Sequence, residues 1–463
     1  MAAEPDVDVE PRMFFTAPWE PVLVRRGDAL GLRALADQLA EAVAPDLSNR
    51  VNDGRWVTIL AWCLVRSQEV FHASGGNSVS TREEQRKRYA WLRPLELMWV
   101  ARTIALATDW KDRSLAGQRS VMPWYEESGE PARRFGMTAD QFRSYRQTGM
   151  YGGYRLAFRK WPGLTRQGDG WTPGTESARL ADWLDKRLGS ARPSWPLHSS
   201  DGVSKQSAKL GQGAEHPWWL GKWNTFDHCG RKADANTLPR RKDDFAALPE
   251  VDLLMPLIFG ETTAGKRRRQ VAREVKKSKA ANHIEVCEHL AGAFKGVPEI
   301  AQIPRFSRLA DAGMAAMDLM AGALYKDSRT TLAKVAALPT AGSLCSELRA
   351  AATEWLKKPD AQIRHLETAN RFAGAITTAA ANECLKEVLY HHELYGGGLR
   401  WFVLRDGRIE PRTPPRSGTS RYRFRLWQLC RLAAQCGLQS GMPAGLENDT
   451  AVEEDELEEA SGE

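Results

Sequence analysis

The sequence has few cysteines, and their spacing forms no recognisable pattern. Its seven cysteines are scattered over 463 residues, and no two of them form a Cys-x-x-Cys pair. Neither a disulfide framework nor a structural zinc site is therefore indicated. The chain also has no evident signal peptide and no apolar run long enough to cross a bilayer, which predicts a cytoplasmic protein without a membrane partner.

The motifs of common catalytic sites are missing as well. The sequence contains no Gly-x-Ser-x-Gly, no His-Glu-x-x-His and no Gly-x-Gly-x-x-Gly, and no pair of carboxylates is convincingly placed for acid–base chemistry. His391-His392, at the predicted end of a helix, is favoured there by the helix dipole alone. We therefore assign no catalytic residue, no metal ligand and no cofactor, and the balance is against an enzyme.

Basic side chains are missing from both ends of the chain. Residues 1–10 carry four acids and no base, and residues 447–463 carry nine acids and no base. The overall net charge of +7 therefore conceals +20 on residues 11–446. A body of this charge attracts polyanions such as nucleic acids. The acidic residues 447–463 can shield this body from non-specific nucleic acid, or they can simply improve solubility.

Hydrophobic periodicity is what the sequence does have, and it is helical over most of the chain. Apolar residues recur at helical spacing after Asp28, between Trp56 and Leu64, and from about residue 83 to residue 107. From residue 266 to residue 392 the pattern is helical again. The spacing predicts a core seam from Phe306 to Leu324, in which methionines fill gaps.

The C-terminal part adds the one strand signal. Two apolar stretches flank Asp406-Gly407, a dipeptide typical of tight hairpin turns. A last helix then ends at Gly437. The predicted fold is mainly α, with two helical lobes, a loop-rich middle and one small C-terminal β-hairpin.

Composition changes along the chain predict five segments. They are an extended N-terminal arm (1–24), an N-terminal helical domain (25–188), a loop-rich connector with tryptophan and basic residues (189–260), a C-terminal helical domain with the hairpin near 399–411 (261–440), and a disordered acidic tail (441–463).

Residues 260–267, GETTAGKR, look like a phosphate-binding loop. Gly260, Gly265 and Lys266 fit the pattern, but Arg267 stands where a magnesium-binding hydroxyl is needed. Pro256 lies in the apolar run before the loop and argues against the central strand that such a loop follows. We predict a loop that enters a basic helix.

That basic helix is the main candidate site. Spacings of three, four and seven residues place several of its cations on one helical face, where they can contact phosphates. A solvated helix face is the alternative. The candidate residues are Lys266, Arg267, Arg268, Arg269, Arg273, Lys276 and Lys277.

A second candidate patch combines Arg155, Arg159, Lys160 and Trp161. Basic residues beside an aromatic ring can hold phosphates and stack a base, or they can anchor a loop to the core. Gly152-Gly153 is expected to end a helix that starts at a capping box of Thr138 and Gln141. Residues 155–161 alternate enough to form a strand, which would give an element like a winged helix, but a plain helix followed by an ordered loop is favoured.

Two stretches, LADQLAEAVAPDLSNRVNDGRWVTILAWCL (35–64) and HHELYGGGLRWFVL (391–404), resemble a known group of sequences. Together they are similar to a family of uncharacterised bacterial proteins encoded beside helicases and phospholipase-D-like proteins in phage-defence or DNA-modification loci. The family more often has Arg-Tyr where this chain has Arg55-Trp56. The resemblance implies a defence context but transfers no catalytic residue.

These observations lead to one main functional hypothesis. The chain is expected to be a nucleic-acid-associated, non-enzymatic component of a bacterial anti-phage defence system, with DNA favoured over RNA. One alternative is a hydrolase, either a degenerate NTPase or a nuclease with an unrecognised site. Another is an assembly subunit that docks a helicase or other defence-system subunits.

Overall fold

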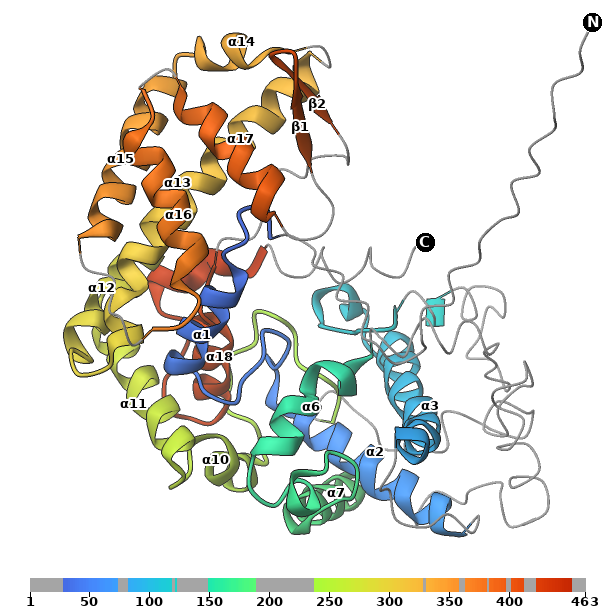
Figure 1. The fold of residues 1–463 in the computed structure, drawn as a ribbon. Coiled ribbons are helices and arrows are strands. Elements are labelled where there is room, and N and C mark those ends of the chain that lie inside the picture. Colours follow the sequence, from blue (N-terminus) through green and yellow to red (C-terminus); the bar gives the residue numbers. More distant parts are fainter. Residues whose placement is uncertain are drawn as a thin grey trace, which may run out of the picture.

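The computed structural model describes most of the chain, and everything below concerns these residues. The described ranges are 28–73, 82–118, 121–122, 149–188, 237–327, 330–357, 363–380, 383–396, 401–411 and 422–451. They are mainly α-helical with one two-stranded antiparallel hairpin, as the sequence predicts. Figure 1 shows two groups of helices, with α1 (Arg33–Val43) and α18 (Leu426–Gln435) lying between them.

One group is built around α2 (Gly54–Ala73). This helix packs against α3 (Arg82–Leu106) and α7 (Thr175–Leu188), and α6 (Met150–Lys160) lies across it. Trp62 of α2 and Trp99 of α3 are both fully buried and meet edge to face, with ring centroids 5.9 Å apart. Such aromatic pairs add to the stabilisation that burial itself provides. The helix that the apolar spacing between Trp56 and Leu64 predicts is confirmed, and its apolar residues are buried.

The other group surrounds the long helix α13 (Pro298–Lys326). It packs against α12 (His283–Ala293), α15 (Ala341–Leu356) and α17 (Cys384–Tyr395), and α15 in turn packs on α16 (Leu366–Thr378). A short helix, α14 (Leu332–Ala336), connects α13 to α15 in the chain and contacts both of them and α17. The predicted seam from Phe306 to Leu324 is buried and forms the centre of this group.

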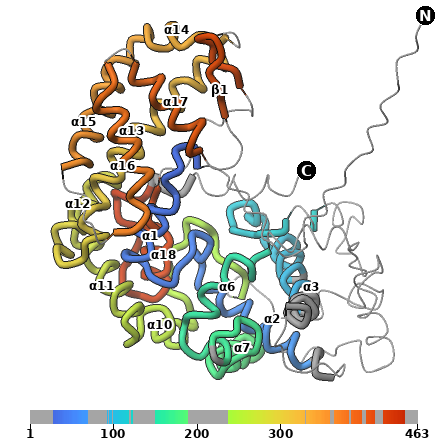
Figure 2. The backbone as a smooth tube through the Cα atoms, viewed as in Figure 1, coloured from blue at the N-terminus to red at the C-terminus, as the bar shows by residue number. Residues whose placement is uncertain are grey.

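The hairpin pairs β1 (Phe402–Arg405) with β2 (Arg408–Pro411) and turns at Asp406-Gly407. Both turn residues have positive φ, 48° and 74°, as a tight hairpin turn requires. Figure 2 shows that α1, near the start of the described chain, lies beside helices of the C-terminal half. It packs against α13 and against α11 (Thr263–Lys277).

Residues 150–160 correct the sequence-based prediction. They form α6, so Gly152-Gly153 does not end a helix and the segment from Arg155 to Lys160 is not a strand. The capping box that was to start an earlier helix lies outside the described residues. Gly153 is buried against the Arg50 side chain, where a Cβ would lie 2.6 Å from the Arg50 Cδ. Close packing therefore explains this glycine, at the modest cost of a glycine within a helix.

Two further segments differ from expectation. Residues 251–259 belong to the predicted loop-rich connector, but they form the helix α10 (Val251–Phe259), with Pro256 inside it. The acidic tail is predicted to be disordered from residue 441, yet residues 444–451 form the 3₁₀ helix η5 (Ala444–Ala451). Leu446 is fully buried and supplies the apolar anchor that the acidic composition conceals. The limits of the other predicted segments stay predictions.

Candidate nucleic-acid interface

The basic run begins with a well-capped helix. Thr262 is the N-cap of α11, and its hydroxyl oxygen accepts a hydrogen bond from the Gly265 N–H at 3.0 Å. Threonine in this position satisfies one of the amide donors that every helix start leaves unpaired. Val271, Ala272 and Val275 are buried and fix one side of the helix against the protein.

The opposite side of α11 gathers positive charge. At 100° per residue, five cations fall within about one third of the helix circumference. None of them is fully buried, and four of the five are exposed. We call these residues the cationic face of α11: Lys266, Arg269, Arg273, Lys276 and Lys277.

Only two carboxylates pair with this face among the described residues. Glu261 lies 3.2 Å from Lys266 and 3.4 Å from Arg269, and Glu274 lies 2.7 Å from Lys277. The Glu261 side chain is 76% exposed, so water competes for both of its ion pairs. Arg273 forms no ion pair with any described residue, and a net positive charge remains on the face.

The structure corrects the predicted site at Arg268, which is not a surface residue. Its side chain is buried: Nε donates to the Ile258 carbonyl at 2.7 Å, and Nη1 donates to the Pro45 carbonyl. Burial lowers the pKa of this arginine to about 10, against the opposing effect of the carboxylate of Asp46. Arg268 therefore holds α11 to the end of α10 and to the turn after α1, and it cannot reach a phosphate at the surface.

The second predicted patch is also divided between surface and interior. Trp161 is buried beneath Arg268, so its ring offers no surface for a base. Arg155 lies over the Trp171 ring at 4.9 Å, and Arg159 donates to the Gly168 carbonyl at 3.4 Å. Lys160 and Arg159 remain exposed. The two predicted patches thus meet inside the protein, through Trp161 and Arg268.

The remaining member of the basic run is Arg267. It is half-buried, and its guanidinium lies over the Phe294 ring at 5.4 Å. It therefore sits at the edge of α11 that faces α12, rather than on the cationic face. Helical spacing put Arg268 among the candidate phosphate contacts, but the same spacing could have shown that its side chain is buried. Arg268 lies three, four and seven residues before Val271, Ala272 and Val275, which is the spacing of one buried stripe.

Residues 260–267 do not form a phosphate loop. The segment before them is a helix instead of a strand, and the amides of Gly265 and Lys266 are used within the helix start by Thr262. A phosphate loop instead directs several amides at the bound phosphates. A Cβ at Gly265 would lie 2.5 Å from the Gly260 carbonyl oxygen, which gives this glycine a packing reason.

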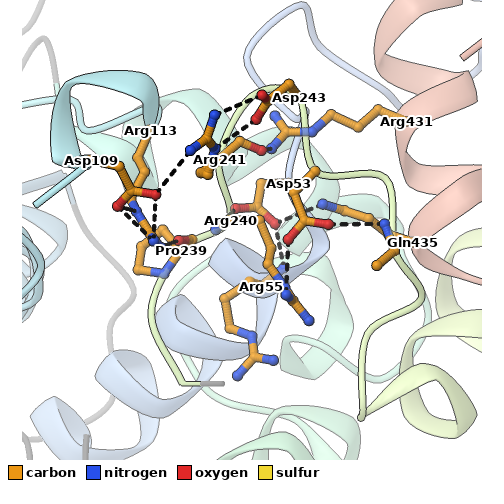
Figure 3. Close-up of polar contacts among 12 residues, drawn as sticks. Asp53, Arg55, Asp109, Arg113, Pro239, Arg240, Arg241, Asp243, Arg431 and Gln435 are labelled. Carbon is orange, nitrogen blue, oxygen red and sulfur yellow. Dashed lines mark hydrogen bonds and ion pairs between the residues drawn. The ribbon is translucent and has the colours of Figure 1, made fainter. Parts of the chain in front are cut away.

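Behind the surface, Asp53 organises a buried polar network (Figure 3). Its carboxylate accepts from the N–H of Arg55 at 2.9 Å, from the N–H of Arg240 at 2.8 Å and from Gln435 Nε2 at 3.2 Å. The first of these bonds caps α2, and the other two attach the 237–250 segment and α18 to the same helix start. Gln435 also accepts from the Gly54 N–H at 2.8 Å.

Two arginines, Arg241 and Arg431, continue this network toward the surface. Arg241 bonds Asp243 at 2.8 Å with two of its nitrogens and lies 3.6 Å from Asp109 (Figure 3). Arg431 is fully buried and donates to the Arg241 carbonyl at 2.6 Å. The hydrogen bond to Asp243 raises the pKa of Arg241 and lowers that of Asp243. Arg241 is paired with carboxylates, and Arg431 is bonded to a backbone carbonyl in the interior, so this cluster joins elements instead of offering an accessible cationic surface.

Arg55, from one of the two stretches that carry the family resemblance, is an internal ion-pair partner. Its Nη2 lies 2.9 Å from Glu250 Oε2, and neither side chain is exposed. Thr58 donates to the other oxygen of Glu250 at 3.0 Å. Burial lowers the pKa of Arg55 and raises that of Glu250, whereas their mutual attraction opposes both shifts. The pair connects α2 to the start of α10.

His391 and His392 of α17 have structural partners as well. His391 Nε2 lies 2.9 Å from the Leu30 carbonyl, and His392 Nδ1 lies 2.7 Å from the Ala29 carbonyl. His392 Nε2 accepts from the Trp401 N–H at 2.9 Å, so its proton resides on Nδ1. Burial lowers the pKa of His391 to about 4. The two imidazoles attach the segment before α1 to α17.

Three comparisons of this chain with known proteins complete the description of the site. No protein-family model, curated protein or solved structure matches this chain. Among the described residues, no three His, Cys, Asp or Glu side chains are grouped so that they could hold a metal ion. In the same part of the chain, no helix combines the length and the apolar character needed to span a membrane.

Proposed function

We propose that this protein binds nucleic acid, DNA in preference to RNA, through the cationic face of α11. The supporting observation is the arrangement of five cations on one accessible face of a 15-residue helix, with two carboxylates paired to them. Such a helix is about 22 Å long, which is enough to follow several phosphates of one backbone. The role is that of a nucleic-acid-associated component without enzymatic activity of its own.

The ion pairs on this face do not prevent phosphate binding. Exposed ion pairs contribute about 0–1 kcal/mol each, because water already stabilises both partners. A phosphate that replaces Glu261 beside Lys266 and Arg269 therefore meets little opposition. Phosphate contacts also release counterions from the nucleic acid, which drives association at low salt. Because phosphate contacts carry no base information, we expect weak dependence on sequence.

The wider context comes from the sequence resemblance alone. Membership of an anti-phage defence system, and docking to a helicase or another defence subunit, stay predictions that the helical fold neither requires nor contradicts. Phosphate binding by α11 supports an association with nucleic acid and leaves the partner proteins to be identified by co-purification.

Fluorescence anisotropy with a labelled duplex of about 20 base pairs tests the proposal. Affinity should fall steeply as salt rises, and the triple variant Arg269→Glu, Arg273→Glu, Lys277→Glu should bind much more weakly with a smaller salt slope. Single-stranded DNA and duplex RNA of the same length establish the preference for DNA.

The matched control reverses three exposed cations on the other helical group: Lys326→Glu, Lys357→Glu, Arg364→Glu. It changes the net charge by the same amount, so it separates a local site from a general charge effect. The proposal fails if neither duplex nor single strand binds at low salt in micromolar excess. It also fails if both triple variants lose affinity equally.

A further inference from the structure

We infer that the acidic segment 452–463 binds the cationic face of α11 and competes there with nucleic acid. This inference rests on the proposed function and adds regulation of the same site. The segment carries seven acids and no base: Glu453, Glu454, Asp455, Glu456, Glu458, Glu459 and Glu463.

The structure shows where this segment leaves the protein. It follows η5, which packs against α12 and α18, and both of these helices pack against α11. Gly445 lies directly on the turn after α11, since a Cβ there would be 3.0 Å from the carbonyl oxygens of both Ala280 and Asn282. With Leu446 fully buried, the start of η5 is anchored at the C-terminal end of α11.

A second contact connects the same two regions. Lys276 Nζ, on the cationic face, donates to the Leu438 carbonyl at 3.2 Å, in the link between α18 and η5. Lys279 is exposed just beyond the end of α11. The path of the chain toward the acidic segment therefore starts beside the most basic end of the face.

The length of the segment is sufficient. A 3₁₀ helix rises about 2 Å per residue, so the end of η5 lies within roughly 15 Å of the turn after α11. The twelve residues that follow can span up to about 40 Å when extended. The whole of α11 is about 22 Å long. The acids can thus reach every cation of the face.

Charge complementarity and tethering favour this occupant over free anions. A tethered segment acts at an effective concentration in the millimolar range, so even weak contacts become populated. The interaction is exposed and will be screened by salt, with a Debye length of about 10 Å at 0.1 M. Nucleic acid has the higher charge density and displaces the segment, which thereby excludes weak, non-specific ligands.

Zero-length carbodiimide cross-linking tests the contact without nucleic acid. This reagent joins carboxylates to lysine amines that touch them, and mass spectrometry maps the products. We expect cross-links from residues 453–459 to Lys266, Lys276 or Lys277 within monomers at low salt, and their loss at high salt. The inference is overturned if these acids join only other lysines, or none. Cross-links found only in dimers overturn it too, because the occupant would then be a second copy.

Affinity measurements test the competition. A chain that ends at Ala451, and a full-length chain with the seven acids changed to glutamine, should both bind duplex DNA about tenfold tighter at about 50 mM salt. The gain should vanish at high salt. It should also be much smaller in the Arg269→Glu, Arg273→Glu, Lys277→Glu background, because the segment then has no face to cover. An equal gain in both backgrounds would mean general repulsion and would overturn the inference.

The two proposals fail separately. If the shortened chain binds no nucleic acid, the proposed function falls, and the inferred competition falls with it, even where cross-links from the segment to α11 persist. If DNA binding needs α11 but the segment neither cross-links to it nor changes the affinity, only the present inference is wrong.

Discussion

The guanidinium carbon of Arg268 lies 5.4 Å from the centre of the Trp161 ring, and both side chains are buried. Each residue belongs to a different basic patch of the sequence, and each looks like a surface contact in the linear pattern. Their contact instead fastens α11 to the end of α6. The accessible cations of α11 project from a helix that this buried arginine holds in place.

Arg268→Met should lower stability without acting on the binding face. It leaves the carbonyls of Ile258 and Pro45 without their donor, at a cost of roughly 1–3 kcal/mol. Arg273→Met should change stability by less than about 0.5 kcal/mol but weaken DNA binding. Urea unfolding followed by tryptophan fluorescence, with anisotropy on the folded proteins, checks both. The opposite ranking of the two variants would contradict the assigned roles.

The sequence predicts the helices well because their apolar residues follow the helical period. The seam of α13 and the inward face of α2 are examples, and the hairpin turn is specified locally by Asp406-Gly407. The site is harder to predict because burial of a charge depends on distant partners. Nothing near Arg55 in the sequence identifies Glu250, and nothing near Asp53 identifies Gln435.

The errors have physical causes of the same kind. Gly152-Gly153 has low helix propensity, but packing of Gly153 against Arg50 outweighs that local preference. Pro256 correctly indicates that the apolar run around it is not a strand. The run forms α10 instead, and burial of its apolar side chains stabilises this helix despite the proline. Buried Leu446 anchors η5 in a stretch where acids dominate the composition.

Gly31→Ala should destabilise the protein more than Gly407→Ala. Both glycines have positive φ, 66° and 74°, so each substitution costs roughly 1–2 kcal/mol of backbone strain. At Gly31 the new Cβ would also lie 2.4 Å from the Tyr395 carbonyl oxygen, whereas nothing lies within 4 Å at Gly407. Thermal unfolding of the two variants measures the difference. Equal losses would show that α17 does not approach the segment before α1 this closely.

His391 should make stability depend on pH below neutrality. Its pKa is lowered from 6.5 to about 4 by burial, so the unfolded chain takes up the proton first. The stabilisation is complete above pH 6.5 and is lost as pH falls toward 4, by about 2 kcal/mol at pH 5. His391→Gln keeps an N–H donor for Leu30 but does not titrate. The stability difference between wild type and this variant should therefore shrink between pH 7.5 and 5, and a constant difference would exclude the histidine as the cause.

Glu250→Gln should be among the most damaging conservative changes. It leaves the guanidinium of Arg55 buried without its ion-pair partner, which typically costs about 3–5 kcal/mol. Glu261→Gln is the matched control, since Glu261 also pairs with arginine but is exposed, and it should cost less than about 1 kcal/mol. Urea unfolding measures both free energies. Changing Arg55 and Glu250 together to methionine should recover part of the loss, because no unpaired charge then remains inside; a double variant less stable than Glu250→Gln alone would show that packing around the pair, rather than its charge balance, sets the cost.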